Sequence, residues 1–132
     1  MDYIGRNLDI IAQCIRDNQY VELETERLEF KDLSTGENWL ELYKTVCAFL
    51  NSNGGIIVIG IKDKNNEKDK AKRHYRFTGF NYDNEPKLKE ISQLFTNAEN
   101  QKVNLNSYFL TPEIRDFKEG KVAIIYVDEL PR

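Results

Sequence analysis

The sequence NSNGGIIVIGIKD, residues 51–63, decides the fold of this chain. Residues 55–61 form an almost continuous β-branched run, which is typical of a strand that is covered on both faces. The Asn-Ser-Asn-Gly-Gly before it is a strong signal for the end of a helix followed by a turn. We therefore predict a helix that ends near Asn51, a tight turn, and a central strand whose end at Lys62 and Asp63 reaches polar surroundings.

Apolar periodicity predicts further elements on both sides of this stretch. Apolar residues recur at helical spacing before Asn51 and near the N-terminus, and Leu28 and Phe30 alternate with charged residues as in a half-buried strand. Further along, the pattern predicts a short strand, a third helix with Pro86 in its first turn, and two strands joined by a Glu-Gly turn. The expected helices cover 2–17, 37–51 and 85–100, and the expected strands cover the end of 20–31, then 55–61, 75–80, 107–117 and 121–129.

These elements predict an α+β fold, in which a mixed β-sheet packs with three helices in the order α-β-α-β-β-α-β-β. We expect a single domain over residues 1–132, with a helix within residues 1–20. Because the chain ends directly after a predicted strand, we expect it to be the N-terminal part of a longer protein. Charged residues make up 31% of the chain, which favours a thin two-layer domain. Cys14 and Cys47 fall on apolar helix faces and are expected to be buried free thiols.

The sequence carries no signal for export or for a membrane. Charged residues occur within the first few positions of the N-terminus, and the continuous apolar segment that a signal peptide needs is absent there. No apolar run approaches the roughly 20 residues that a membrane-spanning helix needs. We expect a cytoplasmic protein without a membrane partner.

Positive charge is concentrated in one segment of an acidic chain. The net charge is −3, yet residues 62–76 contain seven basic and three acidic residues, a local charge of +4, so the rest carries −7. Together with His74, Tyr75 and Phe77, these cations offer phosphate contacts and base stacking, which favours nucleic-acid binding. A solvated loop with interspersed acids explains the segment equally well. The candidate binding residues are Lys62, Lys64, Lys68, Lys70, Lys72, Arg73 and Arg76.

Three ordered segments resemble the Schlafen AlbA domain. They are ETERLEFK at 24–31, KTVCAFLN at 44–51 with the glycine pair that follows, and IVIGIKD at 57–63. The resemblance extends from about Glu22 to the end of the chain, with Leu50 in place of a small residue and Lys62 where relatives often have an acid. It implies a mixed α/β fold and a nucleic-acid-binding role, with DNA or RNA as partner, in a larger regulatory or defence protein of the transcriptional-regulator type.

The resemblance also implies an enzymatic alternative. Related domains of animal Schlafens cleave structured RNA with three acidic residues and a divalent metal, and by motif position these acids are Glu24, Glu29 and Asp63. Carboxylates suit Mg²⁺ or Mn²⁺, which prefer oxygen ligands. Glu24 and Glu29 are an odd number of residues apart, so the chain must bend for them to converge. The simpler interpretation is that all three are solvated surface carboxylates.

Lys31 is a weaker candidate for the same chemistry. It forms an E-x-K pair with Glu29 on one face of the expected strand, and a lysine there stabilises charge that develops on a phosphate. A surface ion pair explains the two residues more simply.

The sequence thus leaves three hypotheses. The first is a nucleic-acid-binding domain that needs no cofactor. The second is a metal-dependent endoribonuclease that uses Glu24, Glu29 and Asp63. The third is a protein-interaction or dimerisation module. The animal ribonucleases use a second domain copy to grip RNA, and for this single copy a homodimer or further domains of the same chain would have to complete such a groove.

Overall fold

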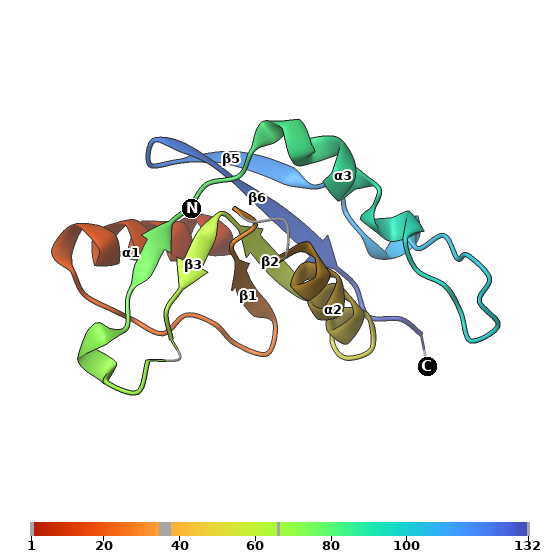
Figure 1. Ribbon diagram of the computed structural model, residues 1–132, viewed down its shortest axis with the longest axis horizontal. Coiled ribbons are helices and arrows are strands. Elements are labelled where there is room, and N and C mark those ends of the chain that lie inside the picture. Colours follow the sequence, from red (N-terminus) through yellow and green to blue (C-terminus); the bar gives the residue numbers. More distant parts are fainter. Residues whose placement is uncertain (1, 35–37, 66, 132) are drawn as a thin grey trace.

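The computed structural model describes residues 2–34, 38–65 and 67–131 and confirms the α+β fold (Figure 1). A four-stranded mixed sheet with the order β1-β2-β6-β5 forms its centre, and β3 and β4 form a separate two-stranded sheet. The helices are α1 (Tyr3–Asp17), α2 (Asn38–Leu50) and α3 (Glu85–Lys89). The strands are β1 (Leu28–Lys31), β2 (Gly55–Ile59), β3 (Ile61–Asp63), β4 (Tyr75–Phe77), β5 (Glu113–Phe117) and β6 (Gly120–Val127).

Strand β2 is the central strand that the sequence predicts. It pairs in parallel with β1 and antiparallel with β6, and Val58 lies opposite both Phe30 and Ile124. Ile57 and Ile59 are buried in the core on one face of the sheet, and Val58 is buried in the core on the other. The continuous β-branched run therefore does mark a strand that is covered on both faces.

The predicted strand over 55–61 is interrupted at Gly60, which adds one strand to the predicted order. Gly60 has a φ of +115°, and a Cβ there would lie 3.0 Å from the backbone of Gly79. Its carbonyl oxygen accepts hydrogen bonds from Thr78 N and Gly79 N, at 2.8 and 2.9 Å. The chain thus leaves the four-stranded sheet at Gly60, and β3 pairs with β4 in a separate sheet.

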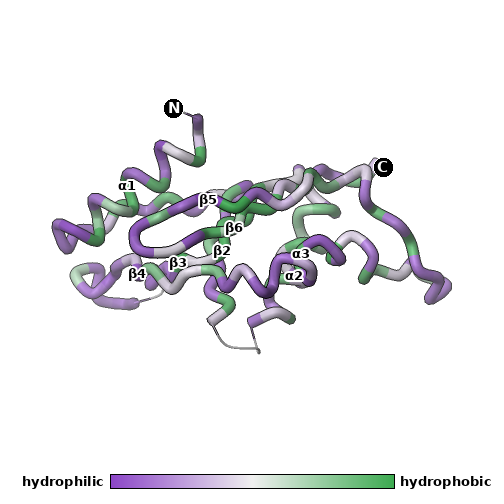
Figure 2. Tube along the Cα trace, turned by 90° about the horizontal axis from the view of Figure 1, so that it is seen from above, coloured by the Kyte–Doolittle hydropathy of each residue, from purple (hydrophilic) through white to green (hydrophobic). Residues whose placement is uncertain are grey.

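The domain has three layers, so the expectation of two layers is wrong. Helices α2 and α3 pack on one face of the sheet, and α1 packs on the other together with residues of β3 and β4. Figure 2 shows α1 and the α2–α3 pair on opposite sides of the sheet. The physical reason is that consecutive residues of β2 and β6 are apolar, so each face of the sheet needs its own cover.

The third helix is much shorter than the predicted 85–100. It ends at Lys89, a single 3₁₀ turn follows at Ile91–Gln93, and the strand expected from residue 107 begins only at Glu113. Asn97 accounts only for the last part of the predicted helix, because its Oδ1 accepts hydrogen bonds from Glu99 N and Gln101 N, at 2.9 and 3.0 Å, and holds residues 97–101 in a turn. Such local side-chain bonds compete with helix formation.

The predictions for the C-terminal hairpin and for the two cysteines are confirmed in part. The hairpin of β5 and β6 is confirmed, with Phe117 opposite Gly120 across a two-residue connection. Cys14 is buried as expected, but Cys47 is exposed, so that prediction is wrong. No helix within the described ranges is long and apolar enough to cross a membrane.

Candidate functional site

The seven candidate cations lie on a β-hairpin that projects from the body of the domain. Strands β3 and β4 pair antiparallel, with Lys62 opposite Arg76 and Asp63 opposite Tyr75, and we call residues 61–77 the basic hairpin. Its long loop extends away from the central sheet (Figure 1). The loop is held by a 3₁₀ turn at Lys70–Lys72 and by Lys64 N, which donates to His74 O at 2.9 Å.

The positive charge of the basic hairpin is only partly offset by acids and leaves a charge of +4 over residues 62–76. Lys68, Lys70, Lys72 and Arg76 are exposed, while Lys62, Lys64 and Arg73 are partly buried. Within residues 2–34, 38–65 and 67–131, none of the seven forms an ion pair. Six other cations do, namely Arg16, Lys31, Lys44, Lys89, Arg115 and Lys121.

The aromatic residues of β4 belong to the core, which corrects their expected role in base stacking. Tyr75 is only 4% exposed, and its ring stacks on that of Tyr20 with the centroids 4.9 Å apart. Phe77 is partly buried against Phe117, at 5.4 Å between centroids. Alternate residues of a strand share one face, and this face of β4 turns towards α1. His74 is the one exposed ring among the three.

Glu24 and Asp63 meet at the base of the basic hairpin, and we call them the acidic pair. A tight turn brings them together, because Thr25 and Leu28 exchange backbone hydrogen bonds and reverse the chain. Glu24 Oε2 then accepts from Phe30 N at 3.4 Å, and its Oε1 accepts from Asn65 Nδ2 at 2.9 Å. The bend that convergence requires is therefore present.

The two carboxyl groups influence each other strongly. Burial, followed by the adjacent Asp63 carboxyl group, raises the pKa of Glu24 to about 8. Asp63 Oδ1 accepts a hydrogen bond from the Tyr20 hydroxyl at 2.8 Å, and its Oδ2 is buried without a partner among the described residues. Asp63 also lines a small cleft of about 260 Å³ together with Lys31 and Lys62. The pair thus holds a proton near neutral pH, and loss of that proton frees Asp63 Oδ2 to accept another donor or a cation.

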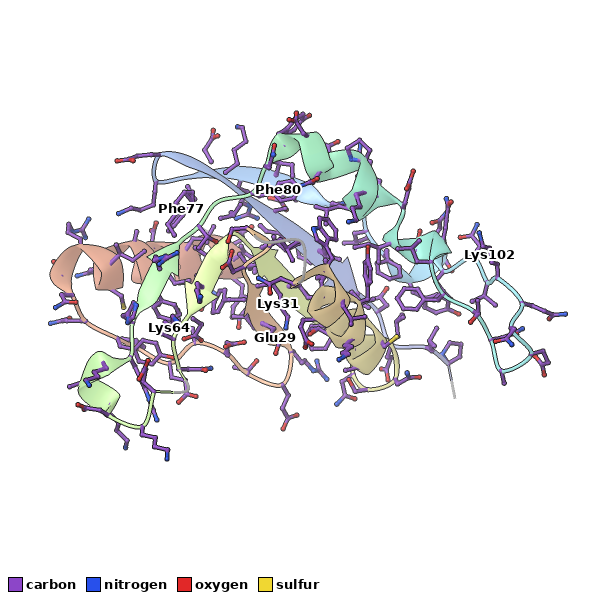
Figure 3. All side chains as sticks on the ribbon, viewed as in Figure 1. Glu29, Lys31, Lys64, Phe77, Phe80 and Lys102 are labelled. Carbon is purple, nitrogen blue, oxygen red and sulfur yellow. The ribbon has the colours of Figure 1, made fainter. Side chains whose placement is uncertain are left out.

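Glu29 does not join the acidic pair closely. Figure 3 shows Glu29 and Lys31 beside each other near α2, whereas Lys64 lies farther away, on the basic hairpin. Lys31 Nζ lies 3.6 Å from Glu29 Oε2, and Glu29 lines a separate depression with Lys44. In the part of the chain that the structure describes, no three His, Cys, Asp or Glu side chains are arranged to hold one metal ion.

The glycine pair after α2 forms a packed turn. Gly54 has a φ of +73°, and its amide donates to Phe49 O at 2.9 Å. A Cβ on Gly54 would lie 2.5 Å from Val127 O, so the close backbone approach explains why glycine is present.

Tyr20 and Asn65 are contacts of the acidic pair that sequence reasoning missed. Tyr20 is 43 residues from Asp63 along the chain, and Asn65 is 41 residues from Glu24. Neither residue belongs to a motif or a periodic pattern, so no signal in a single sequence points to them.

Comparisons with known proteins agree with this architecture. A family model described as Schlafen, AlbA_2 matches residues 24–132, which include the central sheet, the basic hairpin and the acidic pair. No curated protein sequence matches the chain. A solution NMR structure is similar, with 25% identity and a TM-score of 0.56, over 92% of this chain and 72% of that one. It is the N-terminal domain of a Nitrosomonas europaea protein described as related to the ATP-dependent DNA helicase RecG. Because the family model covers most of the chain, this protein belongs to the Schlafen AlbA_2 family.

Proposed function

We propose that this domain binds nucleic acid through the basic hairpin and serves a longer regulatory or defence protein. One observation carries the proposal: seven cations lie on one projecting hairpin, and within the described residues none forms an ion pair. Phosphate binding needs cations of this kind, because it gains its free energy by releasing the counterions of the nucleic acid. Family membership and the helicase-related name of the similar structure support the same function.

The test compares two triple variants of equal charge. In the first, Lys68→Gln, Lys70→Gln and Lys72→Gln remove three exposed cations of the hairpin. In the control, Arg6→Gln, Lys102→Gln and Lys118→Gln remove three exposed cations elsewhere. Binding of labelled duplex DNA and of structured RNA is measured over a series of salt concentrations.

We expect the hairpin variant to bind more weakly and the control to bind like the wild type. The slope of log K against log salt should fall by roughly 0.9 for each phosphate contact that is removed. Equal losses in both variants would mean that only net charge matters. Absence of binding by the wild-type domain would favour the protein-interaction or dimerisation module instead.

A second candidate function is metal-dependent RNA cleavage at the acidic pair. The buried Asp63 Oδ2 without a described partner, beside the carboxyl group of Glu24, favours it. Mg²⁺ commonly binds through one or two carboxylates and retains several waters, so two acids suit it. Glu24 and Asp63 would hold the ion, which would supply an activated water and stabilise the leaving oxygen. Glu29 is paired with Lys31 and adds only a smaller repulsion to Glu24, so its part in such a site depends on movement of its side chain.

This candidate predicts saturable Mn²⁺ binding by the wild type and no binding by Asp63→Asn. Titration calorimetry in the absence of RNA measures both. Cleavage of structured RNA should require the metal, stop with EDTA and vanish in the same variant, while hairpin-mediated binding persists. Cleavage that survives Asp63→Asn would exclude the acidic pair as its source.

A further inference from the structure

A short segment before β1 is attached to the basic hairpin at several points. We call residues 20–24 the strap, because they connect the region after α1 to the turn at Thr25. The Tyr75 hydroxyl donates to Val21 O at 2.7 Å and accepts from Leu23 N at 3.2 Å. At one end of the strap Tyr20 binds Asp63 and stacks on Tyr75, and at the other end Glu24 binds Asn65. Every residue of the strap except Glu22 therefore has a named contact with the hairpin.

The basic hairpin depends on such contacts for its orientation. Its strands β3 and β4 have three residues each, and an isolated two-stranded hairpin is marginally stable at best. It leaves the main sheet at Gly60, and among the described residues its two strands pair with each other in a separate sheet. Ile61 and Tyr75 anchor its base in the core beneath α1, and the strap supplies the polar contacts.

We infer that Tyr20 is a positioning residue, which fixes the basic hairpin through Asp63 and Tyr75 in the orientation that binds nucleic acid. The inference rests on the proposed function of the hairpin. Tyr20 lies before residue 24, where the family match begins, so the orientation of the hairpin depends on a residue outside that match.

The physical reason lies in what the Tyr20 hydroxyl satisfies. Without it, Asp63 Oδ1 lacks a described partner, and the carboxyl group of Glu24 is the one adjacent group that shares a proton with Asp63. An unsatisfied, partly buried carboxylate is unfavourable, and the hairpin relieves this by moving towards solvent. A loosened hairpin must be ordered again on binding, which weakens affinity even though Tyr20 itself touches no phosphate.

Tyr20→Phe tests the inference because it removes the hydroxyl and keeps the stacked ring. Hydrogen exchange should become roughly tenfold faster or more at hairpin amides such as Lys64 N, and it should stay unchanged in β6. The affinity for duplex DNA or structured RNA should fall by roughly tenfold. Tyr3→Phe is the matched control, since Tyr3 is 45% exposed, and neither property should change in it.

A double-mutant cycle separates positioning from a general structural effect. When the three lysines Lys68, Lys70 and Lys72 are already replaced by glutamine, Tyr20→Phe should cost little further affinity, because both changes act on one hairpin. Full additivity, or unchanged hairpin exchange in Tyr20→Phe, would overturn the inference. If the wild type binds no nucleic acid, the proposed function fails, and the exchange measurement still decides whether Tyr20 holds the hairpin.

Discussion

At the scale of single residues, Glu24 sets the charge state of the acidic pair. Its carboxyl group is partly buried and faces Asp63, so the charged form is disfavoured and its pKa rises to about 8, although the hydrogen bond from Phe30 N acts in the opposite direction. The folded protein therefore keeps a proton that the unfolded chain releases at much lower pH. This difference couples folding stability to pH.

We expect the free energy of unfolding to fall as the pH rises from about 4.5, the ordinary pKa of glutamate, to about 8. In this range the unfolded state loses the proton of Glu24 and the native state retains it, so a higher pH favours unfolding. The slope should stay below the limit of about 1.4 kcal/mol per pH unit for one proton, because solvent screens a half-exposed pair. Urea unfolding at a series of pH values measures it.

Two variants show whether Glu24 is the source of this dependence. Glu24→Gln cannot ionise and should remove the decrease, whereas Glu22→Gln, at an exposed neighbouring position, should retain it. A decrease of the same size in Glu24→Gln would assign the effect to other groups.

At the scale of elements, α1 is an integral part of the core although it precedes the family match. Ile4, Leu8, Ile11 and Cys14 are buried in the same core as Leu28 and Val58 of the sheet. At the start of the helix, Asp2 Oδ1 accepts a hydrogen bond from Gly5 N at 2.7 Å. Asp2 Oδ2 also forms an ion pair with Arg115 of β5, at 2.5 Å. The helix is therefore attached to the sheet by both packing and charge.

Adjacent isoleucines of α1 provide a direct test of this packing. Ile11 is 0% exposed and Ile10 is 38% exposed. Ile11→Ala should lower the free energy of unfolding by about 2–5 kcal/mol, because it removes buried methylenes and leaves a cavity. Ile10→Ala should change it by no more than about 0.5 kcal/mol. Chemical denaturation measures both values, and similar small effects would mean that α1 is dispensable for the core.

At the scale of the whole molecule, the negative charge lies on the layered body and the positive charge lies on the projecting basic hairpin. The body combines three layers with a charge of −7 over the residues outside 62–76, and the projecting basic hairpin carries +4. An acidic body repels phosphate while a basic projection attracts it, so the field orients an approaching nucleic acid towards the hairpin. This separation allows an acidic protein, with a pI near 5.3, to present a local basic surface.

The sequence by itself determined those features that depend on local patterns. Helices α1 and α2, strand β2, the β5–β6 hairpin and the basic segment follow from periodicity, turn residues and charge within a few neighbouring positions. The acids Glu24, Glu29 and Asp63 came from motif position alone, which states nothing about where their side chains point.

Only the tertiary structure decided how distant segments combine. Gly60 sends the chain out of the sheet because of its approach to Gly79, and Asn97 holds the residues after it in a turn by binding nearby amides. Tyr75 is buried, and Tyr20 reaches Asp63, because contacts over 43 to 54 residues of sequence bring the strap and the hairpin together. Such contacts leave no periodic signal in one sequence, since they depend on the complete packing of the chain and not on neighbouring residues.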